Sequence, residues 1–404
     1  MTSITCHFCE KSESELFDMN TSVIRSPNRK HRICQNCANK ISLFSIQESS
    51  KNSNNINYNL NDLTPLDIFN KISEFVLFQD DAVKCVSLAT YQHIQRILGK
   101  YDGKNAVISK SNVLLAGPSG TGKTAIIKTI KNMFDFPVIE TNANSITANG
   151  YHGGDVSDLI YKLYIESGED LESTERGIIF VDEIDKIKEC GGSDKDVNGS
   201  SVQESLLKII EGTDVHLDYP DREIDVFVDT TNILFICAGA FSGIDEVYRK
   251  RTSQHSIGFG KPLQEPKENF DYSKLEIEDF SEYGFIDEFL GRLPVLAFLT
   301  KLTHDQYKEM LVKPTNSLFS QLDVLFNNEE SSFSYSDRAL DELVKQSMKK
   351  KLGARGAKNI LSNIIDDQLF NISSSPQQSA VILDYIDDKF LITKEPLNKV
   401  SIVA

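Results

Sequence analysis

Eight consecutive residues form a pattern suited to holding the phosphates of a nucleotide. They match the pattern G-x-x-x-x-G-K-[ST] and are Gly117, Pro118, Ser119, Gly120, Thr121, Gly122, Lys123 and Thr124. Glycines let backbone N–H groups approach phosphate oxygens, and the start of the following helix adds partial positive charge. Lys123 would reach the β- and γ-phosphates, and the hydroxyl of Thr124 would hold Mg²⁺. A glycine-rich turn that contains lysine by chance is the alternative, but the predicted flanking strand and helix favour ATP binding.

Two acidic residues follow the apolar run 178–181. Asp182 would bind Mg²⁺, in most enzymes of this kind through water, and Glu183 would orient or deprotonate the attacking water. The same two residues could simply mark a solvated strand end. Their position downstream of the phosphate-binding pattern favours nucleotide hydrolysis, which needs positioning and charge stabilisation but no covalent intermediate.

Four of the seven cysteines form two C-x-x-C pairs near the N-terminus, Cys6 with Cys9 and Cys34 with Cys37. Each pair can place two thiolates on one side of a tight turn, so two pairs can complete a tetrahedral Zn²⁺ site. Four free thiols are the alternative. Without a metal, so short a segment has too small a core to fold alone.

The elements that must position these residues alternate between strands and helices. Short apolar strands are predicted at 112–116, 136–140, 177–181 and 233–237, and helices at 80–98, at 124–133 and from Pro65 onward, with Thr64 as its N-cap. This alternation is typical of an α/β domain built on a parallel sheet. From about residue 303 helical periodicity is followed by apolar runs, which indicates a smaller α+β domain.

Composition and motifs together divide the chain into four parts. We expect a zinc-binding domain over residues 1–45, a flexible linker over 46–62, a large ATPase domain over 63–301 and a small C-terminal domain over 302–404. The linker is crowded with Ser and Asn, which cannot bury enough apolar surface to order it.

The charge balance and the apolar pattern exclude several other classes. The 404 residues include 59 acidic and 43 basic ones, a net charge of -16 that repels nucleic-acid phosphates. No apolar run is long enough to span a bilayer, and the N-terminus carries no secretory signal pattern. We therefore expect a cytoplasmic protein that binds neither membranes nor nucleic acid.

Taken together, these motifs resemble the ClpX family of AAA+ ATPases over nearly the whole chain. The resemblance is carried by the four cysteines, the phosphate-binding residues and further segments at 63–65, 181–186, 206–213, 235–241, 257–260, 288–294 and 353–356. It implies an α/β P-loop AAA+ large domain with a parallel sheet, a smaller α+β C-terminal domain and an N-terminal zinc module like a treble cleft. It also implies an ATP-dependent unfoldase that threads unfolded or tagged proteins into a ClpP-type peptidase, with adaptor proteins binding the zinc module.

The resemblance assigns roles to two arginines. Arg292 matches the arginine finger, which reaches the γ-phosphate bound by a neighbouring subunit, and therefore implies a homohexamer. Arg355 matches the second sensor arginine, which contacts nucleotide from the small domain. The alternatives are a surface arginine beside a turn for Arg292 and a helix-start arginine paired to a surface carboxylate for Arg355.

Two further segments match loops that contact other proteins in the family. Ile257, Gly258 and Phe259 match the tripeptide that docks on the peptidase ring, although a loop folded back onto its own core would also bury them. Tyr151 with His152 matches the pore loop that grips substrate, where the family has a small β-branched residue in place of His152.

Two departures from the family are specific to this chain. Phe78 replaces glycine in the segment 76–79 that contacts adenine, and a bulky ring there could repack the adenine pocket. The acidic stretch 216–223 replaces a basic loop at the pore entrance, which predicts weaker selection of substrates that end in a free apolar tail.

Two other functions compete with peptidase-coupled unfolding. A remodelling chaperone that works alone would need no docking tripeptide, and a nucleic-acid-handling ATPase would use the zinc module as a DNA reader. The net charge argues against the second, although basic residues cluster over 25–32. We find no serine or cysteine catalytic arrangement in a recognisable local context, so we expect no intrinsic peptidase activity.

Overall fold

The computed structural model describes residues 23–25, 32–34, 60, 62–99, 108–146, 156–188, 197–219, 224–253, 270–328, 331–350, 353–373 and 379–396. The chain forms two compact units, residues 1–57 with 132–134 and residues 58–131 with 135–404. In the first unit, β1 (Val23–Arg25) pairs antiparallel with β2 (Arg32–Cys34). The elements below belong to the second unit, apart from the last residues of α5.

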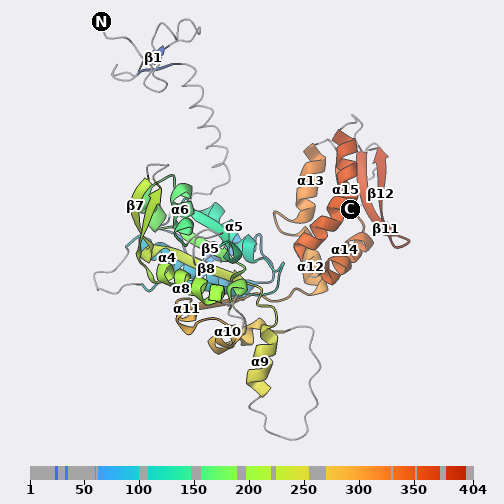
Figure 1. Cartoon of the computed structure of the whole chain (residues 1–404). Helices are drawn as coiled ribbons and strands as arrows, with labels where there is room; N and C mark the ends of the chain where they lie inside the picture. Colours follow the sequence, from blue (N-terminus) through green and yellow to red (C-terminus); the bar gives the residue numbers. More distant parts are fainter. Residues whose placement is uncertain are drawn as a thin grey trace. The chain divides into compact units, whose positions relative to one another are not determined.

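A five-stranded parallel sheet is the framework of the large part of the second unit (Figure 1). Its strands follow the order β4 (Val138–Asn142), β5 (Ile178–Asp182), β8 (Leu234–Gly239), β3 (Val113–Ala116) and β9 (Val295–Phe298). Every residue of β3 and β8 is buried, as expected for parallel strands covered on both faces. The parallel sheet predicted from the alternating pattern is therefore confirmed.

The helices of this part connect the strands and surround the sheet (Figure 1). They are α3 (Pro65–Ser73), α4 (Asp80–Ile97), α5 (Lys123–Met133), α6 (Val156–Glu166), α7 (Leu171–Glu175), α8 (Val197–Glu211), α9 (Ile244–Ser253), α10 (Ile277–Tyr283) and α11 (Asp287–Gly291). Short 3-10 turns lie at Ala143–Ser145, Ile184–Ile187, Thr230–Asn232 and Tyr272–Lys274. One apolar core joins strands and helices and includes Leu163, Val181, Leu206, Phe235 and Phe280.

The start of α3 follows directly from its sequence. The Asp67 N–H donates to Thr64 Oγ1 at 3.3 Å, and the Thr64 N–H donates to Asp67 Oδ2 at 2.9 Å. This reciprocal capping box, with Pro65 in the first turn, confirms Thr64 as the N-cap.

Two antiparallel strands pack on the core of the large part where the acidic stretch begins. Strand β6 (Asp214–Tyr219) pairs antiparallel with β7 (Ile224–Asp229), with His216 opposite Phe227. The first half of the stretch compared with the pore-entrance loop is therefore a strand, a structure that the sequence analysis did not predict. Side chains of β6 alternate between its two faces, so Leu217 is buried while Asp214, His216 and Asp218 face solvent.

The C-terminal part of the same unit has its own apolar core and a three-stranded sheet. It comprises α12 (His304–Val312), α13 (Leu318–Asn328), β10 (Ser332–Tyr335), α14 (Asp337–Lys349), α15 (Ala354–Ser373), β11 (Ser379–Ile386) and β12 (Lys389–Pro396). Strand β10 runs parallel to β11, and β11 runs antiparallel to β12. Buried Phe319, Phe326, Leu343 and Leu361 lie in the core, so the predicted smaller α+β fold is confirmed.

One strand of the main sheet was missed. Strand β9 lies beside β3 at the edge, in the region where we expected only the end of the large domain. It has four residues, only Ala297 is fully buried, and Pro294 precedes it, so its local pattern is weak. Among the described helices, none is both long enough and apolar enough to cross a membrane.

Candidate nucleotide-binding site

The phosphate-binding residues lie where β3 passes into α5. A Cβ added to Gly117 would lie 2.7 Å from the backbone oxygen of Leu299, so only glycine fits against the chain that follows β9. Gly122 has φ +110°, and its added Cβ would lie 3.1 Å from Val76 Cγ1. Close packing therefore requires glycine at 117, and both the backbone angle and close packing favour glycine at 122.

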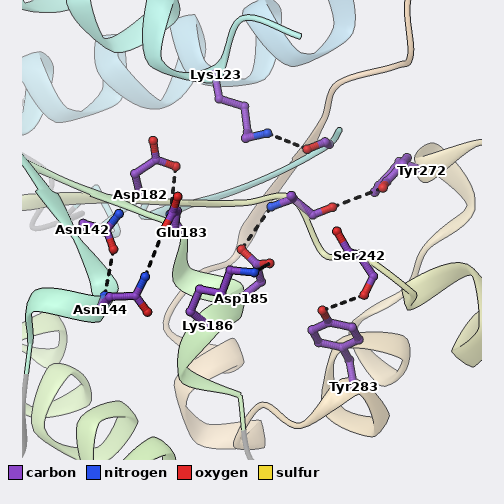
Figure 2. A network of polar contacts seen from close by, with 12 residues as sticks. Lys123, Asn142, Asn144, Asp182, Glu183, Asp185, Lys186, Ser242, Tyr272 and Tyr283 are labelled. Atoms are coloured by element: carbon purple, nitrogen blue, oxygen red, sulfur yellow. Dashed lines mark hydrogen bonds and ion pairs between the residues drawn. The ribbon is translucent and has the colours of Figure 1, made fainter. Parts of the chain in front are cut away.

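Lys123 turns back over this loop. Its Nζ donates to Gly117 O at 2.6 Å and to Pro118 O at 2.9 Å (Figure 2). Burial lowers the pKa of Lys123 to about 8, while the charges of Asp182 and Asp185 oppose that shift. An anionic phosphate beside the ammonium would favour the charged form further.

The tertiary structure brings Thr124, at the amino end of α5, to Asp182, at the carboxyl end of β5. Thr124 Oγ1 donates to Asp182 Oδ2 at 3.4 Å, and the Glu183 N–H donates to Asp182 Oδ1 at 2.8 Å. A hydroxyl and a carboxylate are hard oxygen donors, the ligand type that Mg²⁺ prefers. These two side chains therefore fit the predicted Mg²⁺ site.

Glu183 has an unusual backbone. Its φ of +57° lies in the left-handed region, which costs a non-glycine residue about 1–3 kcal/mol and is typical of functional sites. Its Oε2 accepts a hydrogen bond from Asn144 Nδ2 at 2.9 Å (Figure 2). The Asn144 N–H in turn donates to Asn142 Oδ1 at 2.9 Å. Sequence reasoning missed Asn144, although the polar run after β4 was a signal.

The turn after β8 is fixed beside these residues. Buried Asp185 accepts from the Ala240 N–H at 3.2 Å, and Tyr272 donates its hydroxyl to Ala240 O at 3.2 Å. Tyr283 donates to Ser242 O at 3.0 Å (Figure 2). An added Cβ on Gly239 would lie 2.9 Å from Asp185 Oδ1, so this turn packs tightly on the acidic segment.

A cavity of about 540 Å³ extends from the phosphate-binding loop. One part of its lining is apolar, with Val76, Leu77 and Leu318, and another is charged, with Arg355 and Lys358. Apolar side chains suit the base of a nucleotide, and cationic side chains suit its phosphates. Arg355, for which the resemblance implies a contact with nucleotide, is among the residues of this lining.

Phe78 does not line this cavity. Its φ is +63°, and its ring packs against the core of the C-terminal part. The ring therefore lies against that core and not in the cavity lining, and the expected repacking of the adenine pocket stays a prediction.

Arg292 also lies outside the cavity lining. It ends α11 and is 55% exposed, and its Nε and Nη2 contact Glu211 Oε1 at 2.9 and 2.7 Å. Its backbone oxygen accepts from Asn112 Nδ2 at 2.9 Å. A guanidinium on the surface and outside the cavity lining is free to face a neighbouring chain.

The remaining predicted site residues lie outside the described residues. They are Tyr151, His152, Ile257, Gly258, Phe259, Cys6, Cys9 and Cys37, and the side chain of Cys34 is likewise not described. Among the described ranges, no group of three or more His, Cys, Asp or Glu side chains could hold a metal ion.

The fold and this site define a P-loop ATPase of the AAA class. The family described as AAA domain (Cdc48 subfamily) matches residues 108–296, and the C-terminal, D2-small domain, of ClpB protein matches residues 302–378.

Curated relatives place the chain within that class. The ATP-dependent Clp protease ATP-binding subunit ClpX of Bacteroides thetaiotaomicron is 33% identical over 401 residues, 95% of each chain. The ClpX of Borrelia duttonii is 35% identical over 94% of this chain and 89% of its own, and that of Treponema denticola is 33% identical over 95% and 93%. The chain belongs to the ClpX family.

Proposed function

We propose that this chain is an ATP-dependent protein unfoldase that threads substrate proteins into a ClpP-type peptidase. The observation that carries the proposal is the cavity that is lined by the phosphate-binding loop, by the acidic pair at the end of β5 and by Arg355. The family supports the coupling to a peptidase, because its members are named as ATP-binding subunits of the Clp protease.

We assign each of the described site residues one role in ATP hydrolysis. The backbone of 117–122 binds phosphate oxygens, and Lys123 neutralises their charge. Thr124 and Asp182 would hold Mg²⁺, which would supply positive charge beside the phosphates. Glu183 orients the attacking water, and Asn144 fixes the direction of its carboxylate.

Two arginines complete the proposed machinery. Arg355 contacts the nucleotide within its own chain, since it lines the same cavity as Lys123. Arg292 acts on the nucleotide of the next subunit in a homohexamer, since it is exposed and lies outside that lining. Hydrolysis then depends on assembly.

The remaining assignments extend the proposal beyond the described residues. Tyr151 and His152 grip the substrate in the pore, and Ile257, Gly258 and Phe259 dock on the peptidase. Cys6, Cys9, Cys34 and Cys37 hold Zn²⁺ in a module that binds adaptor proteins, since four thiolates form a tetrahedral zinc set. The predicted boundaries at 45, 62 and 301 and the cytoplasmic location belong to the same proposal.

Reconstitution with a ClpP-type peptidase and a folded fluorescent substrate tests this function. We expect fluorescence to fall only when ATP is present. In the Glu183→Gln variant, ATP hydrolysis should fall at least ~100-fold while nucleotide still binds, because only the group that orients water is lost.

Glu204→Gln is the matched control, since Glu204 is exposed on α8 and away from the cavity lining. Degradation that persists unchanged in Glu183→Gln would contradict the assigned role. Unfolding that proceeds equally with and without the peptidase, and never leads to degradation, would favour the stand-alone chaperone instead.

A further inference from the structure

A buried side-chain amide lies at the end of the main sheet opposite to the phosphate-binding loop. Asn112 directly precedes β3 and is 2% exposed, whereas Gly117 follows the carboxyl end of the same strand. Because β3 is extended, the two residues lie roughly 16 Å apart at about 3.3 Å per residue. Asn112 is also absent from the lining of the nucleotide cavity. It therefore does not touch a nucleotide bound by its own chain.

Both halves of this amide are hydrogen-bonded. Asn112 Oδ1 accepts from the Phe235 N–H on β8 at 3.0 Å, and Nδ2 donates to Arg292 O at 2.9 Å. The backbone oxygen of Asn112 accepts from the Val295 N–H at 3.2 Å, where β9 begins. Since one partner is a donor and the other an acceptor, the amide fits in a single orientation. It connects the middle strand of the sheet to the residue that ends α11.

The other end of α11 is held by a second buried amide. Gln203 on α8 is 0% exposed, and its Oε1 accepts from the N–H of Ile286, the N-cap of α11, at 2.9 Å. Its Nε2 donates to Ile187 O at 2.8 Å and to Gly284 O at 3.2 Å. The backbone that leads to Arg292 is thus fixed at both ends by buried hydrogen bonds, which are costly to break.

The side chain of Arg292 is held much less firmly than its backbone. Its partner Glu211 is 41% exposed, and Arg292 itself is 55% exposed. An exposed ion pair contributes little to stability, whereas loss of a buried hydrogen bond leaves polar atoms unsatisfied. Arg292 therefore combines a fixed backbone with a guanidinium that can leave Glu211 for a neighbouring chain.

We propose that Asn112 is a positioning residue for the arginine that acts on the nucleotide of the neighbouring chain. Its bond to the Arg292 carbonyl fixes the point from which the guanidinium extends. Less conformational freedom is then lost when the guanidinium reaches a phosphate, and its approach is aligned beforehand. This inference rests on the proposed function, because that function assigns Arg292 to the next subunit.

The first test removes only the bond to Arg292. In Asn112→Asp, one carboxylate oxygen still accepts from the Phe235 N–H, but no donor remains for the Arg292 carbonyl. We expect kcat for ATP hydrolysis to fall roughly tenfold, because the arginine is misplaced. The dissociation constant of a fluorescent ADP analogue should stay within about twofold, because the chain's own phosphate-binding loop is untouched.

Mixed rings distinguish a misplaced arginine from a damaged nucleotide site. Asn112→Asp mixed equally with Glu183→Gln should recover roughly a quarter of the original ATP hydrolysis, since one interface in about four joins an intact site to a well-placed arginine. Asn112→Asp mixed with Arg292→Ala should show no recovery, because neither component supplies a well-placed arginine.

Two further variants complete the comparison. Asn232→Asp is the matched control, because Asn232 Oδ1 accepts from Arg96 Nε at 3.0 Å and a carboxylate keeps that bond. We expect its kcat to be unchanged. Asn112→Ser guards against the effect of a buried charge, since serine is neutral and too short to bind both partners. It should give the same pattern in mixed rings as Asn112→Asp.

Three results would overturn the inference. An unchanged kcat in both variants at position 112 would show that the bond to Arg292 is not needed. Recovery with Arg292→Ala but not with Glu183→Gln would place the defect in the chain's own site, and recovery with neither would indicate a merely structural loss.

A reference mixture separates this inference from the function on which it rests. Arg292→Ala mixed with Glu183→Gln contains no change at position 112. If that mixture stays inactive, the assignment of Arg292 to the next subunit is wrong, and the role of Asn112 is rejected with it. If it recovers activity, the results at position 112 bear on Asn112 alone.

Discussion

At the residue scale, Phe78 shows how one departure from the family is accommodated. A φ of +63° is a conformation that glycine adopts freely and phenylalanine adopts only with strain. The ring packs against the core of the C-terminal part, which offsets that strain. The side-chain amide of the next residue, Gln79, makes two hydrogen bonds to the backbone of Thr300, of 2.9 and 2.8 Å.

Because of this backbone angle, we expect a glycine variant at position 78 to be more stable than an alanine variant, the reverse of the usual order. Phe78→Ala keeps the left-handed strain and loses the ring, so we expect it to lower the free energy of unfolding by about 1–3 kcal/mol. Phe78→Gly loses the same ring but relieves the strain, so it should be more stable than the alanine variant by about 1 kcal/mol. Urea unfolding of the two variants measures the difference. A glycine variant less stable than the alanine variant would show that the backbone at this position is not strained.

At the element scale, the start of α15 is set by a close approach of two backbones. Gly353 has φ +55°, and a Cβ there would lie 2.5 Å from the Cα of Gly120 in the phosphate-binding loop. The Gly356 N–H donates to Gly353 O at 2.8 Å, so the turn leads directly into the helix. Arg355, on the first turn of α15, reaches the cavity because this approach is possible.

Gly353→Ala should therefore weaken nucleotide binding. The added methyl group must push α15 and the phosphate-binding loop apart, and we expect the dissociation constant for a fluorescent ADP analogue to rise about tenfold. Gly99→Ala is the control, because Gly99 has φ +60° with nothing within 4 Å of an added Cβ. Both variants carry similar backbone strain, so equal nucleotide affinities in the two would contradict the steric argument.

At the scale of the whole molecule, the chain holds one proposed catalytic group away from its own site. Arg292 is paired with Glu211 at the end of α8, and neither residue lines the nucleotide cavity. An exposed pair of this kind is worth only about 0–1 kcal/mol, so an assembling neighbour can displace it at little cost. The active unit we propose is therefore an interface between two chains.

Mixing two inactive variants tests whether Arg292 acts in trans. Arg292→Ala keeps an intact Glu183 but offers no arginine, and Glu183→Gln offers the arginine without the carboxylate. In randomly mixed rings, roughly one interface in four joins an intact site to an intact arginine, so steady-state ATP hydrolysis should recover to roughly a quarter of the original rate. A mixture no more active than the sum of its separate components would show that Arg292 does not act across the interface.

The sequence by itself determined the nucleotide chemistry and the class of fold. The phosphate-binding residues, the pair Asp182–Glu183 and the N-cap Thr64 are read from local patterns. Such patterns are reliable because residues close in the chain have their relative geometry set by a few backbone angles. The expected strands were found with ends shifted by no more than a few residues.

Only the tertiary structure decided which distant residues meet. No local spacing predicts the hydrogen bonds between side chains that are far apart in the sequence. Examples are those of Asn144 to Glu183, Arg292 to Glu211 and Arg251 to Asp279. The weak edge strand β9 also becomes a strand only because β3 lies beside it. These features depend on how whole elements pack, since burial and hydrogen-bond partners are supplied by segments remote in the chain.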